Sequence, residues 1–209
     1  MGGLALYKHI IWDFDGTLFD TYPVMGNAFQ MTLLESGIIE SLDEILKYMK
    51  ISMTHAIQHY KEKYLIDAKF IEKYEEKRKS MECEYCKPYI GAEDICRSIY
   101  NSGKKNYLYT HRGESAIKLL KANKLYAYFT ECITTLNGFE RKPSPNAINY
   151  LIQKYNILND EAIMIGDREL DILSAKNAGI NACYFNEHGE KNKVAEYSIN
   201  NLKQLKVFL

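Results

Sequence analysis

The stretch from residue 88 to residue 185 alternates between helical patterns and short apolar runs, and this alternation strongly constrains the fold. Helices are expected over residues 91–102, 113–123, 145–156 and 168–178, and strands over residues 106–110, 131–134, 162–166 and 181–185. Repeated strand–helix units build a parallel sheet that helices cover on both faces. Another buried strand is predicted at residues 7–13. We therefore expect an α/β fold with a doubly wound parallel sheet.

A long helical block separates the first predicted strand from this alternating stretch. Residues 22–36 show helical spacing, and residues 41–85 favour helix almost without interruption, so we expect no strand there. Ser41-Leu42-Asp43-Glu44 resembles a capping box, which would begin a helix. The charged run at residues 67–84 predicts one solvated helix face.

This order predicts two domains. Residues 1–15 and 86–209 would form the α/β core, and residues 16–85 would form an all-helical domain inserted after the first strand. A chain of 209 residues is long enough for one good core and a smaller appended unit.

The composition argues against a nucleic-acid-binding or membrane protein. The formal net charge is zero, with 27 basic and 27 acidic residues, so no global charge favours binding to nucleic acid or to a membrane. No apolar stretch approaches the ~20 residues that span a bilayer. The N-terminus leads directly into the first predicted strand, so we expect no signal peptide. We expect a monomer or a weak homodimer.

The five cysteines are an odd number and are scattered along the chain, which predicts reduced thiols and a cytoplasmic protein. Cys83 and Cys86 have the spacing of a metal or redox pair. Because no second pair of ligands follows at a suitable spacing, we interpret them as incidental thiols near a domain junction.

Two carboxylates, Asp13 and Asp15, directly follow the apolar run Ile10-Ile11-Trp12. Residues i and i+2 of an extended chain point to the same side, so both would lie where the first strand ends. Like charges this close are costly unless a cation lies between them or one carries a proton. The pattern predicts a nucleophilic aspartate, an acid/base aspartate and a bound hard cation. A surface turn or a calcium-type loop is the alternative.

Three later segments also place polar residues near predicted strand ends. Thr110 follows the apolar run at 107–109, Lys142 precedes a helical pattern, and Asp167 follows the strand at 162–166. In open α/β sheets the ligand site lies outside the carboxyl ends of the strands. A hydroxyl group, an ammonium group and Mg²⁺ could together hold a phosphoryl group there.

With these segments in this order, nearly the whole chain resembles the haloacid dehalogenase superfamily, closest to its phosphoglycolate phosphatase-like and β-phosphoglucomutase-like branch. Residues 13–20 match the first motif of that family, Thr110 the second, Lys142 the third, and Gly166-Asp167 with Asp171 the fourth. His111 departs from the pattern, because Asn or Ser is more usual after the second-motif residue. The resemblance implies a Rossmann-like core with a helical cap inserted after the first motif.

The resemblance also implies an activity, that of a Mg²⁺-dependent phosphatase acting on a small phosphorylated metabolite, and a mechanism for it. Asp13 would attack phosphorus and form an aspartyl phosphate, and Asp15 would act as acid and then as base. Asp13, the Asp15 backbone carbonyl and Asp167 would hold Mg²⁺. Thr110 and Lys142 would hold the equatorial oxygens of the transferring group.

Several further residues are candidates with weaker signals. Asp171 would be a partner of Lys142 or of the metal, or simply an acidic residue in the first turn of a helix. Substrate contacts are expected from the cap and from the mouth of the site, although a solvated helix surface explains the cap residues nearly as well. The candidates are Lys50, Ser52, His55 and His59 in the cap, and His111 and Arg112 after Thr110.

Alternative functions share these residues. A β-phosphoglucomutase-like phosphotransferase would keep the same aspartates but return the phosphate to the sugar. A dehalogenase is disfavoured because it does not need Asp15, and a phosphonate hydrolase would need an imine-forming lysine, for which Lys50 is a candidate by residue type only. A non-catalytic binding module on the same fold is the remaining class.

Overall fold

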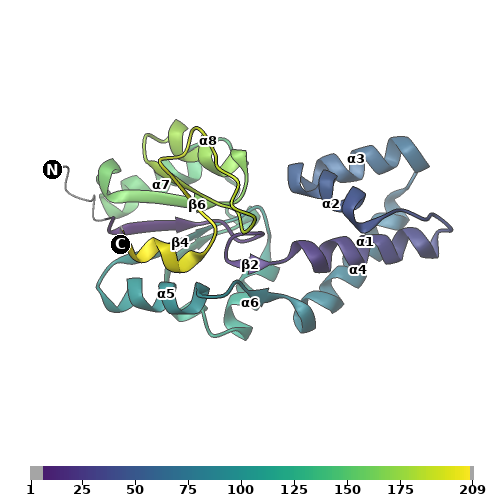
Figure 1. Ribbon diagram of the computed structural model, residues 1–209, viewed down its shortest axis with the longest axis horizontal. Coiled ribbons are helices and arrows are strands. Elements are labelled where there is room, and N and C mark those ends of the chain that lie inside the picture. The colour runs from purple at the N-terminus through teal and green to yellow at the C-terminus, as the bar shows by residue number, and fades with distance from the viewer. Residues whose placement is uncertain (1–6, 208–209) are drawn as a thin grey trace. The chain divides into compact units, whose positions relative to one another are not determined.

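The computed structural model describes residues 7–207, which form two compact units (Figure 1). Residues 7–19 and 88–207 make up one unit, called the core unit below. Asp20–Lys87 makes up the other, called the helical unit. The divisions expected after residues 15 and 85 lie a few residues before these boundaries.

A parallel sheet of six strands runs through the described part of the core unit, in the order β5-β4-β1-β6-β7-β8. The strands are β1 (His9–Trp12), β4 (Lys105–Tyr109), β5 (Phe129–Ile133), β6 (Ala162–Gly166), β7 (Asn181–Phe185) and β8 (Tyr197–Ile199). This sheet confirms the predicted α/β fold. Sequence analysis did not find β8, because three residues with a polar centre carry too little periodicity.

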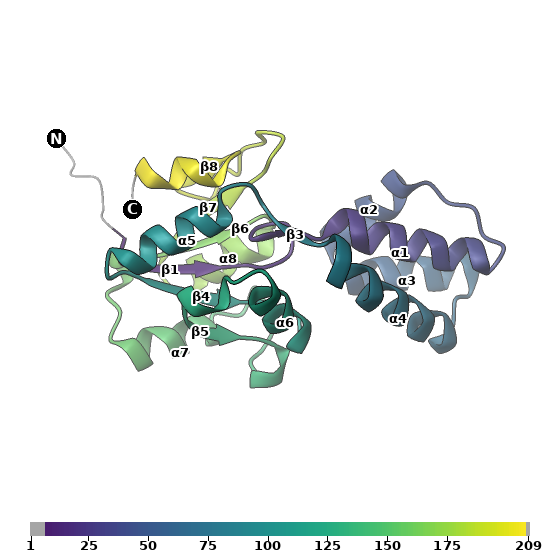
Figure 2. The ribbon, with the colours of Figure 1, turned by 90° about the horizontal axis from the view of Figure 1, so that it is seen from below.

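Helices cover both faces of this sheet. They are α5 (Ala92–Asn101), α6 (Glu114–Ala122), α7 (Asn146–Tyr155) and α8 (Glu169–Asn177), with short 3-10 helices η1 (Tyr126–Tyr128), η2 (Thr135–Asn137), η3 (Asn159–Glu161) and η4 (Leu202–Val207). In Figure 1, α7 and α8 lie above the strands and α5 and α6 below them, and Figure 2 brings α5 and α6 to the front. The fold is therefore doubly wound.

The order of the strands creates a switch point beside β1. From β1 the chain moves outward to β4 and β5, and then returns to β6 on the other side of β1. The carboxyl ends of β1, β4 and β6 consequently lie next to one another, with Trp12 in register with Leu108 and Ile165. Ligand sites of open α/β sheets form at such a point.

The central strands are buried on both faces, as is typical of parallel sheets. Ile10, Ile11 and Trp12 of β1 are fully buried. The indole N–H of Trp12 donates to Oδ1 of the buried Asn106 at 2.9 Å, so this polar pair is satisfied inside the core. The strands thus form a rigid base for the loops that follow their carboxyl ends.

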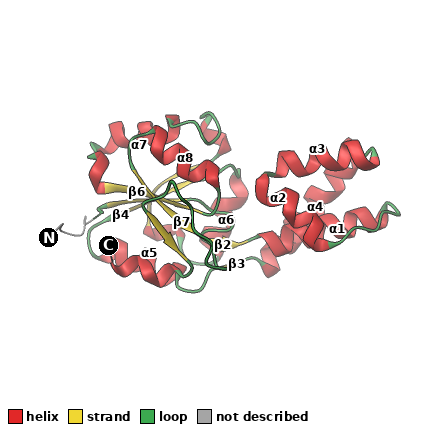
Figure 3. Ribbon diagram, turned by 45° about the horizontal axis from the view of Figure 1, so that its top comes forward, coloured by secondary structure: helices red, strands yellow, loops and turns green. Residues whose placement is uncertain are grey.

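The helical unit contains four helices, coloured red in Figure 3. They are α1 (Tyr22–Glu35), α2 (Leu42–Ile51), α3 (Met53–Tyr64) and α4 (Ala68–Tyr85). Phe29 of α1 packs its ring against those of Tyr60, Phe70 and Tyr74, with centroids 5.1–5.2 Å apart. As expected, Ser41 caps α2, where its hydroxyl accepts from the Glu44 N–H.

The charged run at 67–84 is only partly the solvated face that we expected. Glu82 is buried, and one of its carboxylate oxygens accepts from Arg78 Nη1 at 2.7 Å. An i, i+4 pair on one helix can bury a charge when the partner satisfies it, which the residue types alone do not reveal.

Two short strands, β2 (Phe19–Asp20) and β3 (Lys87–Pro88), pair with each other where the chain passes between the two units. Neither strand was predicted, because two residues show no period. Their pairing places the start and the end of the helical insertion side by side.

Candidate active site

Three charged side chains form a buried cluster at the carboxyl ends of β1 and β6. The Lys142 ammonium donates to Asp13 Oδ1 at 2.5 Å and to Asp171 Oδ1 at 2.7 Å. Each of these side chains is 0–1% exposed. Two carboxylates share one ammonium, so the cluster carries a formal charge of −1 when all three groups are ionised.

The sheet positions this cluster through its backbone. Asp13 directly follows β1, and its N–H donates to the Ile165 carbonyl of β6 at 2.9 Å. Asp171 lies in the first turn of α8, where its Oδ2 accepts from the Arg168 N–H at 3.1 Å. A carboxylate at this position also meets the positive end of the helix dipole.

Gly166 permits this close approach. A Cβ atom on Gly166 would lie 2.3 Å from the Cβ of Asp171, closer than two carbons can pack. The last residue of β6 must therefore be glycine for Asp171 to reach Lys142. The sequence motif contains Gly166 but does not reveal this role, because the steric reason exists only once α8 packs on the sheet.

Asp13 has an unusual environment for a carboxylate. Burial, with the nearby Asp171 charge, raises the pKa of Asp13 to about 6, against the opposing effect of Lys142. Its Oδ1 bonds Lys142, whereas its Oδ2 is buried without a hydrogen-bond partner. Burying an acceptor without a hydrogen-bond partner costs free energy, and a bound ligand at Oδ2 would remove that cost.

Asp13, Asp167 and Asp171 could hold a metal ion. One carboxylate oxygen from each lies within 4.8 Å of the others. Both Asp171 oxygens already accept from Lys142 and from the Arg168 backbone. The Asp13 Oδ2 and the partly exposed Asp167, whose Oδ1 accepts from Thr17 at 3.3 Å, therefore fit a hard cation better.

Thr110 and His111 follow β4 and border the same end of the sheet. Thr110 is 2% exposed, and its Oγ1 accepts from the Arg112 N–H at 3.1 Å. His111 Nε2 accepts from the backbone N–H of Lys142 at 2.8 Å. Burial, with the charges of Lys142 and Arg141, lowers the pKa of His111 to about 3. His111 is therefore a neutral acceptor that links the end of β4 to the Lys142 loop.

Arg112, predicted as a substrate contact, lies against Asp15. Its Nε donates to Asp15 Oδ1 at 2.6 Å, and its side chain is 6% exposed. Its guanidinium carbon is 5.4 Å from the ring centroid of Phe14. Sequence analysis could not foresee this pair, because the two residues are 97 positions apart.

The structure therefore brings together the predicted residues of the core unit. Asp13, Lys142 and Asp171 contact one another, Asp167 adjoins Asp13, Arg112 pairs with Asp15, and His111 bonds the Lys142 backbone.

The predicted cap residues belong to the helical unit. Lys50 and His55 are exposed, and Ser52 is the N-cap of α3, where its hydroxyl accepts from the His55 N–H at 3.0 Å. His59 stacks on the Tyr48 ring at 3.8 Å between centroids. A helix-capping role accounts for Ser52 without a ligand.

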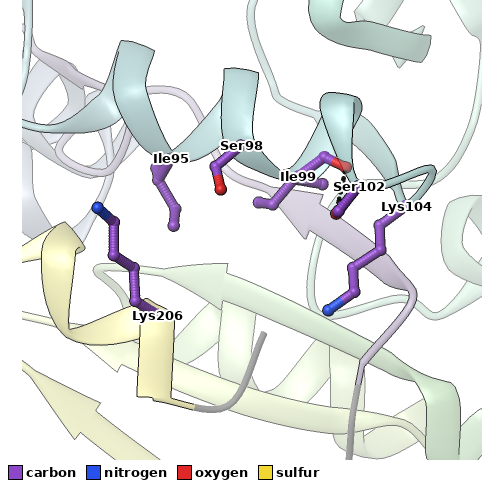
Figure 4. Close-up of a pocket in the computed structure, with 6 residues that line it drawn as sticks. All are labelled: Ile95, Ser98, Ile99, Ser102, Lys104 and Lys206. Carbon is purple, nitrogen blue, oxygen red and sulfur yellow. Dashed lines mark hydrogen bonds between the residues drawn. The ribbon is translucent and has the colours of Figure 1, made fainter.

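A separate pocket of about 280 Å³ lies between α5 and η4 in the core unit (Figure 4). It is lined by Ile95, Ser98, Ile99, Ser102, Lys104 and Lys206. None of these is a predicted site residue, so this pocket is distinct from the Asp13 cluster. Among the described residues, no helix is both long enough and apolar enough to cross a membrane.

Known proteins resemble this chain over most of its length. It is 26% identical over 200 residues to a phosphoglycolate phosphatase of Aliivibrio fischeri, covering 88% of this chain and 87% of that protein. It is 26% identical to the pyrophosphatase PpaX of Listeria monocytogenes, covering 81% and 78%. A solved structure of a hydrolase from Streptococcus pneumoniae superposes with a TM-score of 0.71 at 33% identity, covering 97% and 99%.

The family model for haloacid dehalogenase-like hydrolases matches residues 10–185. That range begins in β1 and ends with β7, and it contains every predicted site residue. The resemblance inferred from the sequence motifs is thus confirmed, and the chain belongs to the haloacid dehalogenase-like hydrolase family.

Proposed function

We propose that this protein is a Mg²⁺-dependent phosphatase that hydrolyses a small phosphorylated metabolite through an aspartyl-phosphate intermediate. The coarser statement, a phosphatase of the haloacid dehalogenase type, agrees with the family and with relatives named phosphoglycolate phosphatase and pyrophosphatase. One observation carries the finer proposal. Asp13 is a buried carboxylate with one oxygen fixed by Lys142 and the other without a partner.

The side chains then have distinct roles. One oxygen of the Asp13 carboxylate attacks phosphorus, and Lys142, which donates to Oδ1, orients the carboxylate. Asp15 gives a proton to the leaving oxygen and later takes one from the attacking water. Thr110 and Lys142 stabilise the negative charge on the equatorial oxygens of the phosphoryl group.

The residues present fit a bound Mg²⁺. Asp13 Oδ2, the Asp167 carboxylate and the Asp15 backbone carbonyl would hold it, because all three are hard oxygen donors. When bound, the ion would neutralise part of the charge on the phosphoryl oxygens. Asp171 stays with Lys142 and holds the ammonium toward Asp13.

Lys50, Ser52, His55 and His111 remain predicted substrate contacts, whereas Arg112, also predicted as one, pairs with Asp15. The helical unit would then act as the cap that selects the substrate. A location in the cytoplasm is part of the same proposal, supported by five cysteines that are all free thiols. A monomer or weak homodimer stays a prediction.

A phosphotransferase of the β-phosphoglucomutase type is not favoured, since the relatives named above are phosphatases. A requirement for a sugar bisphosphate activator would identify it. A non-catalytic binding module would release no phosphate from any ester.

The test is a phosphate-release screen with Mg²⁺ over glycolate phosphate, sugar phosphates, nucleotides, pyrophosphate and cofactor phosphates. We expect one or a few small esters to be hydrolysed, with activity lost in excess chelator and reduced by Ca²⁺. Ca²⁺ accepts more ligands at longer distances and could bind both Asp13 oxygens. Full activity in excess chelator would contradict the metal dependence, and no turnover on the whole panel would contradict the phosphatase.

A further inference from the structure

Hydrogen bonds hold both the backbone and the side chain of Arg112 in place. Its backbone is held on both sides, since its N–H donates to Thr110 Oγ1 at 3.1 Å and its carbonyl accepts from the Thr135 N–H at 2.9 Å. These two bonds fix the backbone of Arg112 at the end of β4, and with it the direction of the Cα–Cβ bond.

The guanidinium also packs over a pair of buried aromatic rings. Its central carbon is 5.4 Å from the Phe14 ring centroid, and Phe14 stacks on Phe19 with centroids 4.5 Å apart and planes 12° apart. Both rings are fully buried. A cation over an aromatic face is attracted by the ring, and here the ring belongs to the residue between Asp13 and Asp15.

The Asp15 carboxylate is the group that this arrangement orients. Arg112 Nε donates to Asp15 Oδ1 at 2.6 Å, a charge-assisted bond between side chains that are 6% and 20% exposed. Asp15 lies in a tight turn, where the Gly16 N–H donates to the Phe19 carbonyl and Gly16 has a φ of 74°. The turn fixes the Asp15 backbone, and Arg112 fixes its side chain.

We propose that Arg112 is a positioning residue that holds the Asp15 carboxylate in its working orientation, and that it does not bind substrate. This inference rests on the proposed function, in which Asp15 transfers the protons. An acid/base group works only within hydrogen-bond reach of the proton it moves, so a carboxylate free to rotate would lose rate in every turnover. A substrate contact would instead alter binding.

The test is a double-mutant cycle measured with 4-nitrophenyl phosphate and Mg²⁺. The variants are Arg112→Met, which keeps the stem over Phe14 but removes the donors, Asp15→Asn, and the double variant. Arg97→Met is the matched control, because Arg97 is exposed on α5 and pairs only with Glu93 and Asp94 in the hydrogen bonds described. Substrate is kept in excess of enzyme, and the enzyme concentration is raised for slow variants so that they still give a measurable rate.

We expect Arg112→Met to lower kcat by at least about tenfold with little change in KM. In the Asp15→Asn background the same change should alter kcat by less than about twofold, because the group that Arg112 positions is already gone. Arg112→Lys, which keeps one charged donor, should fall between wild type and Arg112→Met, and Arg97→Met should match wild type. Arg112→Lys also replaces Arg112→Met in the cycle if the latter does not fold.

Two results would overturn the inference. A higher KM with unchanged kcat would make Arg112 a substrate contact. Equal losses in the wild-type and Asp15→Asn backgrounds would show that Arg112 does not act through Asp15. If the wild type is inactive on 4-nitrophenyl phosphate, the cycle is measured on the best substrate of the panel above. A wild type that is inactive on the whole panel overturns the proposed function, whereas an active wild type with additive losses overturns this inference alone.

Discussion

The candidate site residues of the two units lie in opposite environments. In the core unit, Asp13 and Asp171 are buried, and both accept hydrogen bonds from the buried Lys142. In the helical unit, the candidate residues Lys50 and His55 are exposed, and Ser52 serves its own helix as a cap. None of these three residues is among the rings that pack against Phe29 in the core of the helical unit.

From this difference we expect the core unit to carry out the reaction and the helical unit to select the substrate. A buried charge without its partner is strongly destabilising, so loss of Lys142, the shared partner of Asp13 and Asp171, should affect both the fold and the reaction. An exposed side chain on a stable helix can change at little cost. The comparison predicts large effects on every substrate from the core unit, and small, substrate-dependent effects from the helical unit.

The largest effect should come from Asp13→Asn. The amide is nearly isosteric, but it cannot act as the nucleophile, and we expect kcat to fall by on the order of 10³-fold or more. Turnover and far-UV circular dichroism are the measurements, with Asp94→Asn on the exposed face of α5 as the matched control. A variant that keeps a tenth of wild-type activity would rule Asp13 out as the nucleophile.

Gly166→Ala should be the next most severe change. Its Cβ would lie 2.3 Å from the Cβ of Asp171, so α8 must shift, and Asp171 moves away from Lys142. Overpacking of this kind costs about 1–3 kcal/mol of the free energy of unfolding, measured by urea titration. Gly113→Ala is the control, since its Cβ would meet only Thr135 Oγ1 at 3.5 Å. Equal stability of the two variants would break the steric argument.

His111 should make the stability of the core unit depend on pH. Its pKa is about 3 when folded, against an ordinary value of 6.5, so below pH 6.5 the unfolded chain binds a proton that the folded chain does not. The free energy of unfolding of the wild type should therefore fall relative to His111→Gln as the pH drops from about 7 to about 5. Gln cannot take up a proton but keeps an acceptor for the Lys142 N–H. Parallel curves for the two proteins would contradict a buried neutral His111.

Lys50→Ala should have the smallest effect. If the helical unit selects substrate, kcat/KM should fall several-fold on the best metabolite but not on 4-nitrophenyl phosphate, since remote binding energy acts only on substrates that reach it. Lys47→Ala, an exposed lysine on the same helix, is the control. Equal losses on both substrates would remove Lys50 as a specificity contact, and no loss on either would make it an ordinary solvated lysine.

Those features of the fold that depend on a short stretch of sequence were predicted correctly. The strand at 162–166 and the strand at 181–185 have the predicted bounds, because each is a short apolar run between turn signals. The motif residues at the strand ends were likewise found from their positions. Contacts that need the folded chain were missed, such as the Arg112–Asp15 pair and the Gly166–Asp171 approach. The strands β2 and β3 were missed as well, because these two-residue strands form only when segments far apart in the sequence pair.

The most direct test of the central claim is to trap the covalent intermediate. Enzyme that is turning over its best substrate is quenched in acid and reduced with borohydride, which converts an aspartyl phosphate to homoserine. Peptide mass spectrometry then locates the homoserine. Nucleophilic attack by Asp13 predicts homoserine at position 13, only when substrate and Mg²⁺ are both present. Homoserine at position 15 or 167, or unmodified Asp13 throughout continuing turnover in both the wild type and a slow Asp15→Asn variant, would contradict it.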